Sequence, residues 1–294
     1  MILATGNTCR RGAGFHHGAV LFSFPPPFCR TAAWWLLLLP AAAAEPGLTS
    51  VWQDIAESRS HLALVQLDRL ADQNDRGAQL ARAAAMLDDQ PVTDTGLREA
   101  EALLVAVAGG TDELAAQATY LQTRLYQMHF AQPDFPKAAE LLRALAARLP
   151  QSHWAQLGLV KLGLLQLYAL PEPSGPAARL AVTEALLARI TEKSLQRDLH
   201  LQLGLAGVFW KQPLAGVLEH LLAADRIGGV AGQASEDLIA QIAELSFRDG
   251  QDAQARQYYE RYLREYPTSG RCFTVRVRLQ MLDERAAAAK GARP

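Results

Sequence analysis

Five histidines follow residue 44, and histidine is the side chain best suited to general-base catalysis or metal binding near neutral pH. They are His61, His129, His153, His200 and His220. None forms an HExxH or HxH pattern, or a Cys/His spacing typical of zinc sites. Glu219 and His220 are adjacent, so on a helix their side chains point about 100° apart. We therefore expect these histidines to be structural or surface residues, with no metal site and no cofactor.

Motifs for nucleophilic catalysis and phosphate binding are missing from the sequence. The glycine-rich stretch Gly228–Gly232 has no preceding strand, so we interpret it as a loop between helices. Cys272 stands beside Phe273 at the start of an apolar segment, where a buried small hydrophobe is the expected role. The sequence predicts no catalytic residue, and we expect the chain not to be an enzyme.

Arginine and tyrosine gather near the C-terminus. The residues are Arg256, Tyr258, Tyr259, Arg261, Tyr262, Arg264, Tyr266, Arg271, Arg276, Arg278 and Arg285. One interpretation is a groove for an acidic peptide or an anionic envelope polymer. The other, which the pattern favours, is a core stripe of Tyr259, Tyr262 and Tyr266 beside a solvated face with ion pairs. Three acid–base pairs have the i,i+4 spacing: Asp252–Arg256, Glu260–Arg264 and Arg261–Glu265. The partner-binding residues stay unknown at this stage.

The elements that position these side chains are helices. Apolar residues recur with helical period almost throughout, half of the chain is hydrophobic, and only 20% is charged, as expected for packed helices. Ser50-x-x-Gln53 is a capping-box pattern and predicts the first helix start. The predicted helices lie at about 50–73, 76–88, 97–108, 111–130, 134–149, 152–169, 177–190, 194–210, 213–226, 235–248, 252–266 and 271–285.

Two segments 117 residues apart share one helical pattern and the same terminal proline: KAAELLRALAARLP, ending at Pro150, and QARQYYERYLREYP, ending at Pro267. Such self-similarity predicts stacked helical hairpins. Large-then-small pairs recur at spacings of 41 and 39 residues, as Leu162-Gly163, Leu203-Gly204 and Ile242-Ala243. A glycine inside a helix costs about 1 kcal/mol relative to alanine. We therefore expect Gly158, Gly163, Gly204 and Gly207 to lie at close helix–helix contacts.

Residues 236–269 resemble a tetratricopeptide repeat. The family's conserved places hold Ile242-Ala243, Gly250, Ala255, Tyr259 and Pro267, whereas Tyr262 replaces a small residue. The resemblance is to divergent bacterial envelope repeats, such as those of the outer-membrane assembly lipoprotein and the periplasmic division-coordinator. It implies a right-handed superhelical solenoid of stacked antiparallel helix pairs that binds protein in a concave groove.

The predicted fold class is therefore all-α. We expect N-terminal helices over residues 45–111, tetratricopeptide-like repeats over 112–285, and a frayed tail at 286–294. The proline-rich segment Pro171–Pro176 is either a loop between repeats or a hinge between two arrays, and the resumption of similar helices favours the loop.

Residues 1–44 differ from the rest, since they hold no Asp, Glu or Lys. Arg30, the run TAAWWLLLLP and Ala41–Ala44 are typical of a secretory signal peptide. We expect cleavage after Ala44, with an uncleaved anchor as the alternative, and interpret residues 1 to about 28 as a spurious N-terminal extension. The protein is then periplasmic or secreted, with no integral membrane segment after cleavage.

The predicted function is a non-catalytic scaffold of the bacterial periplasm or cell envelope that binds a partner protein or peptide. A formal charge of −1 gives no reason to expect nucleic acid as a partner. Two alternatives remain: a helical accessory subunit of a peptidoglycan-active envelope enzyme, and a structural repeat protein that assembles with itself.

Overall fold

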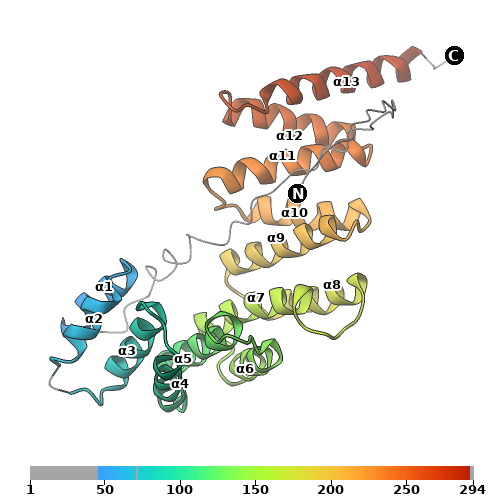
Figure 1. Cartoon of the computed structure of the whole chain (residues 1–294). Helices are drawn as coiled ribbons and strands as arrows, with labels where there is room; N and C mark the ends of the chain where they lie inside the picture. Colours follow the sequence, from blue (N-terminus) through green and yellow to red (C-terminus); the bar gives the residue numbers. More distant parts are fainter. Residues whose placement is uncertain (1–45, 71, 292–294) are drawn as a thin grey trace, which may run out of the picture. The chain divides into compact units, whose positions relative to one another are not determined.

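Helices make up the architecture of the computed structural model, which describes residues 46–70 and 72–291 (Figure 1). No strand occurs within these residues, so the predicted all-α class is confirmed. None of their helices is long and apolar enough to cross a membrane. The predicted signal peptide lies outside the described residues.

Thirteen α-helices follow one another through this part of the chain, with two other helical turns between them. The α-helices are α1 (Pro46–Ala56), α2 (Ser60–Leu67), α3 (Arg76–Asp88), α4 (Asp94–Ala108), α5 (Glu113–Arg124), α6 (Phe135–Arg148), α7 (His153–Tyr168), α8 (Pro176–Glu184), α9 (Lys193–Phe209), α10 (Leu214–Ile227), α11 (Gly232–Arg248), α12 (Asp252–Glu265) and α13 (Cys272–Gly291). A π-helical turn, η2 (Leu125–His129), follows α5, and a 3₁₀ turn, η3 (Ala185–Arg189), follows α8.

Each α-helix packs against the next one along the chain, from α1 to α13 (Figure 1). In addition, α1, α3, α5 and α7 each contact the following odd-numbered helix, which for α7 is α9. These odd-numbered helices therefore form one layer, and their even-numbered partners pack beside it. Contacts between elements that are close in sequence are what consecutive helical hairpins produce.

Helix starts follow the local sequence. Asp75, Thr93, Asp112 and Ser152 are N-caps whose side chains accept a hydrogen bond from a backbone N–H in the first turn. Such caps satisfy N–H groups that have no partner inside the helix. The start of α5 after Asp112 and that of α7 after Ser152 are thus explained by residues visible in the sequence.

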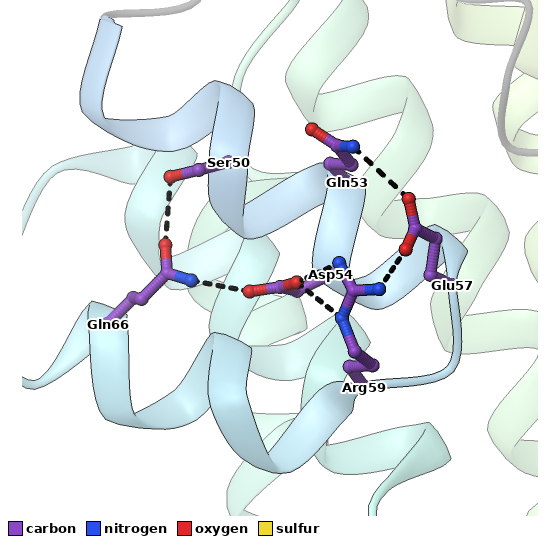
Figure 2. Close-up of polar contacts among 6 residues, drawn as sticks. All are labelled: Ser50, Gln53, Asp54, Glu57, Arg59 and Gln66. Atoms are coloured by element: carbon purple, nitrogen blue, oxygen red, sulfur yellow. Dashed lines mark hydrogen bonds and ion pairs between the residues drawn. The ribbon is translucent and has the colours of Figure 1, made fainter.

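The first predicted helix is wrong in two respects. Helix α1 already begins at Pro46 and ends at Ala56, and α2 starts separately at Ser60. Ser50 therefore lies inside α1, where its hydroxyl donates to Gln66 of α2 at 2.8 Å instead of capping a helix. Asp54, which is buried, accepts hydrogen bonds from Arg59 and Gln66 (Figure 2). This polar network holds α1 and α2 together as a hairpin, which a single long helix would not allow.

Three helix ends also differ from the prediction. The helix expected to reach Phe130 widens into η2, where Phe130 N–H donates to the carbonyl of Leu125 at 3.1 Å. The α-helix after Pro176 ends at Glu184 and becomes η3. Helix α13 continues to Gly291, so the expected frayed tail is helical from residue 286 to 291. The alanine run after Arg285 explains this, because alanine is the strongest helix former.

The segment Pro171–Pro176 is held against the end of α7. The Arg179 guanidinium in α8 donates to the carbonyls of Gln166 (2.8 Å) and Leu170 (2.6 Å). Helix α8 packs on both α7 and α9, and the described residues from 46 onward belong to one compact unit. The segment is therefore a loop within that unit rather than a hinge between two arrays.

The glycine prediction is confirmed at all four positions. A Cβ would lie 3.1 Å from Leu142 at Gly158, 2.8 Å from Leu199 at Gly163, 2.5 Å from Leu221 at Gly204 and 2.7 Å from Val217 at Gly207. Each neighbouring side chain belongs to another helix, namely α6, α9 or α10. The helices approach so closely at these points that any larger residue would have to displace its neighbour.

Candidate protein-interaction surface

The C-terminal tyrosines belong to the packed interior. Tyr262 has no exposed surface and Tyr259 is buried as well, while Tyr266 is partly buried. Three tyrosine hydroxyls donate to carboxylates on other helices: Tyr258 to Asp225 (2.7 Å), Tyr259 to Glu244 (2.9 Å) and Tyr262 to Glu236 (2.5 Å). Burial, together with these carboxylates, raises the pKa of Tyr258 and Tyr259. The hydroxyls therefore stay protonated and keep these bonds at neutral pH.

Most C-terminal arginines have carboxylate partners on a different helix. The cross-helix pairs are Arg261–Asp225 (2.7 Å), Arg271–Asp237 (2.5 Å), Arg278–Glu244 (3.0 Å), Arg285–Asp252 (2.8 Å) and Arg256–Asp283 (2.5 Å). Of the three predicted i,i+4 pairs, Arg261–Glu265 forms at 2.8 Å. Asp252 pairs with Arg285 instead, and Glu260 pairs with Arg256. The structure thus agrees with the interpretation of buried tyrosines beside ion-paired arginines, and the charge of the five arginines in these cross-helix pairs is matched within the chain.

A cavity of about 460 Å³ lies beside η2 and is lined by polar and aromatic side chains. Several of these side chains also contact one another. Tyr126 donates to Glu101, and burial, followed by this bond, raises the pKa of Tyr126 to about 12. The Arg98 guanidinium lies 5.7 Å from the centre of the Phe130 ring and 3.9 Å from Glu101. The charged and aromatic side chains at this cavity therefore contact one another, as the tyrosines, arginines and carboxylates of the C-terminal helices do.

Two of the five predicted structural histidines meet in the fold. His200 on α9 and His220 on α10 lie with their Nδ1 atoms 3.1 Å apart. His153 pairs with Glu192 at 2.8 Å, and Cys272 is buried as predicted, with Sγ 3.2 Å from the carbonyl oxygen of Tyr266. No group of three or more His, Cys, Asp or Glu residues in the described part of the chain is arranged to hold a metal ion.

An exposed aromatic surface lies at the C-terminal ends of α7 and α9. It consists of Tyr168, Leu205, Phe209 and Trp210, and is called the aromatic surface below. The Phe209 side chain is 70% exposed, Tyr168 50% and Leu205 49%. The Tyr168 ring lies 6.2 Å from the Phe209 ring and 5.5 Å from the Trp210 ring, centre to centre. The three rings are therefore one contiguous cluster rather than scattered single residues, with Tyr168 and Phe209 exposed and Trp210 partly buried.

The repeat register explains why these aromatics meet. Tyr168 and Phe209 are 41 residues apart, the same spacing as between Gly163 and Gly204. Equivalent positions of consecutive hairpins lie next to each other when the hairpins stack. At the corresponding place in the next unit, six residues after Ile242, the chain has Arg248 instead of an aromatic residue. The aromatic surface is thus confined to these two units.

The end of α9 that carries Phe209 and Trp210 is fixed by its backbone. Trp210 N–H donates to Ala206 at 3.0 Å, and Gln212 N–H closes the helix on Gly207 at 2.8 Å. Lys211 takes a positive φ of 52°, which reverses the chain after the last turn. Burial raises the pKa of Tyr168, so its hydroxyl stays protonated as a hydrogen-bond donor. The aromatic surface is therefore a pre-formed apolar patch with a polar donor within it.

The sequence alone does not indicate this patch, because Tyr168 and the pair Phe209-Trp210 lie at the ends of two separate predicted helices. The recurring spacing of 41 residues was the signal that could have joined them. No protein-family model matches the chain, and no curated protein matches it significantly. The resemblance of residues 236–269 to a tetratricopeptide repeat stays a prediction.

Proposed function

We propose that this protein is a non-catalytic scaffold that binds a partner protein through the aromatic surface on α7 and α9. Its helix pairs stack as a right-handed superhelical solenoid of tetratricopeptide type. It acts in the periplasm or on the cell envelope, where the predicted signal peptide of residues 1–44 would deliver it.

The packing of the described helices supports the repeat part of this proposal. Consecutive hairpins contact one another in order, and glycines at recurring positions allow the close approach of neighbouring helices. Quasi-repeating hairpins of this kind usually serve as binding surfaces, because each added unit extends an exposed face.

The observation that carries the binding proposal is a cluster of three mutually contacting aromatic rings, of which Tyr168 and Phe209 are exposed. Exposure of such an apolar patch to water is unfavourable. Aromatic residues are also enriched at protein interfaces, where tyrosine and tryptophan often supply much of the binding energy. The contrast within the chain adds weight: the C-terminal tyrosines are buried and hydrogen-bonded, whereas the aromatic surface is open.

Site-specific photo-crosslinking tests the proposal in cells that produce the protein. A benzophenone amino acid is placed at Phe209 and, as a matched control, at Phe273 on α13. Phe273 is 74% exposed and takes part in none of the aromatic contacts found among the described residues. The proposal predicts one defined heterologous adduct from position 209 and none from position 273.

Two results would contradict the proposal. An adduct pattern that is the same at both positions would show that the aromatic surface has no special role. An adduct made only of two copies of this chain would favour the self-assembling structural protein named among the alternatives.

A further inference from the structure

His200 and His220 come from facing helices, and their ring nitrogens converge. The two Nδ1 atoms are 3.1 Å apart, and the ring centres are 5.3 Å apart. Two neutral imidazoles in this position share one hydrogen, with one Nδ1 donating and the other accepting. The same two nitrogens are the atoms with which imidazole binds transition metals.

The spacing of the nitrogens fits metal coordination. Two nitrogens 3.1 Å apart, each about 2.05 Å from one ion, subtend an angle of about 98° at that ion. This angle lies between the roughly 90° of square-planar or octahedral sites and the roughly 109° of tetrahedral sites. We propose that His200 and His220 together bind one divalent transition-metal ion, such as Cu²⁺ or Zn²⁺, through their Nδ1 atoms.

The surroundings prepare both rings for this role. Both imidazoles are partly buried between α9 and α10, and the neutral imidazole is the form that binds metal. The Glu184 carboxylate lies 3.9 Å from Nε2 of His220, and Glu219 is adjacent in sequence. A carboxylate behind a metal-binding histidine favours hydrogen on the outer nitrogen and leaves the inner one free. Arg226 is a nearby cation, and its effect on His200 opposes that of the carboxylates of Glu184 and Glu219.

Metal binding replaces the hydrogen between the rings without net proton release. The imidazole that donates from Nδ1 shifts its hydrogen to Nε2, and both rings turn out of their head-on hydrogen-bonded alignment so that the two Nδ1 lone pairs face the ion. No third His, Cys, Asp or Glu of the described residues completes a ligand group, so water fills the remaining positions. The site is independent of the proposed partner binding, because neither histidine belongs to the aromatic surface.

Copper titration of the full-length protein tests this site, with His16 and His17 replaced by glutamine in every sample to remove their adjacent imidazoles. The proposal predicts one bound Cu²⁺ whose electron paramagnetic resonance spectrum shows coupling to two imidazole nitrogens. His200→Gln and His220→Gln should each weaken binding at least tenfold. His153→Gln is the control and should leave the affinity unchanged within twofold.

The proposal is overturned if neither glutamine variant weakens copper binding, or if the spectrum of the protein with both histidines shows one imidazole nitrogen or none. The second readout does not depend on the folding of any His200 or His220 variant. Circular dichroism of each variant shows whether a loss of binding comes with a loss of helix; in that case the nitrogen coupling alone decides.

Discussion

Helices α10–α13 and the aromatic surface on α7 and α9 use similar residue types in opposite ways. In the C-terminal helices, tyrosine hydroxyls and arginine guanidinium groups bind carboxylates of neighbouring helices, and the tyrosine rings are buried. In the aromatic surface, Tyr168 and Phe209 contact each other while half or more of each side chain stays exposed.

This difference separates residues that build the fold from residues available for recognition. A buried tyrosine with a satisfied hydroxyl contributes to folding free energy and offers nothing to a partner. An exposed ring contributes little to stability, yet it gains the hydrophobic effect when another protein covers it. Substitutions in the two regions should therefore affect different measurements.

Replacing Tyr262 by alanine should cause the largest loss of stability. Its ring is fully buried, and its hydroxyl contacts Glu236 and Ser269. We expect Tyr262→Ala to lower the free energy of unfolding by about 3–5 kcal/mol, as for other large buried aromatics. Urea denaturation measures this change. Tyr168→Ala is the control, and a loss as large in the control would abolish the distinction between the two regions.

Gly204→Ala should destabilise the α9–α10 contact by about 1–3 kcal/mol, because the added methyl group would lie 2.5 Å from Cδ2 and 2.8 Å from Cγ of Leu221. Leu221 is fully buried, so moving it aside would disturb the packing around it. Gly216→Ala on α10 is the matched control, since no atom lies within 4 Å of the new Cβ. It should stabilise the protein by about 0.5–1 kcal/mol. Thermal unfolding that shifts both variants in the same direction would refute this account of the close contact.

The smallest expected effect concerns pH. Burial, followed by the charge of Arg124, lowers the pKa of His129 in η2, and Asp88 opposes this in part. Because its pKa is lower in the folded chain than in the unfolded chain, the unfolded chain binds more protons below about pH 6.5. Stability should fall as the pH drops through this range, and less steeply in His129→Gln. Equal slopes of unfolding free energy against pH in the two proteins would contradict this role.

Much of the fold follows from short-range signals in the sequence. The caps Asp112 and Ser152 define helix starts, and the four interior glycines predict close helix contacts, because these effects act within a few residues or at a fixed repeat position. The break between α1 and α2 escapes such reasoning, since it depends on Asp54 meeting Gln66 of another helix.

The candidate sites were harder to predict for the same reason. His200 and His220 are 20 residues apart, and only the α9–α10 hairpin brings them together. The arginine pairs also cross between helices, so the i,i+4 rule identifies Arg261–Glu265 but not Arg278–Glu244. Side-chain partners chosen across a helix interface depend on rotation and register, which a single sequence does not specify.

The central claim is that the aromatic surface binds a partner and does not hold the fold together. The most direct test uses the partner protein that crosslinks to position 209. It measures the affinity of this partner for the wild-type chain, for the double variant Tyr168→Ser/Phe209→Ser and for Phe273→Ser. We predict that the double variant loses at least tenfold in affinity while its unfolding free energy stays within about 1 kcal/mol of wild type. Phe273→Ser should bind as wild type does. Unchanged affinity of the folded double variant would contradict the account.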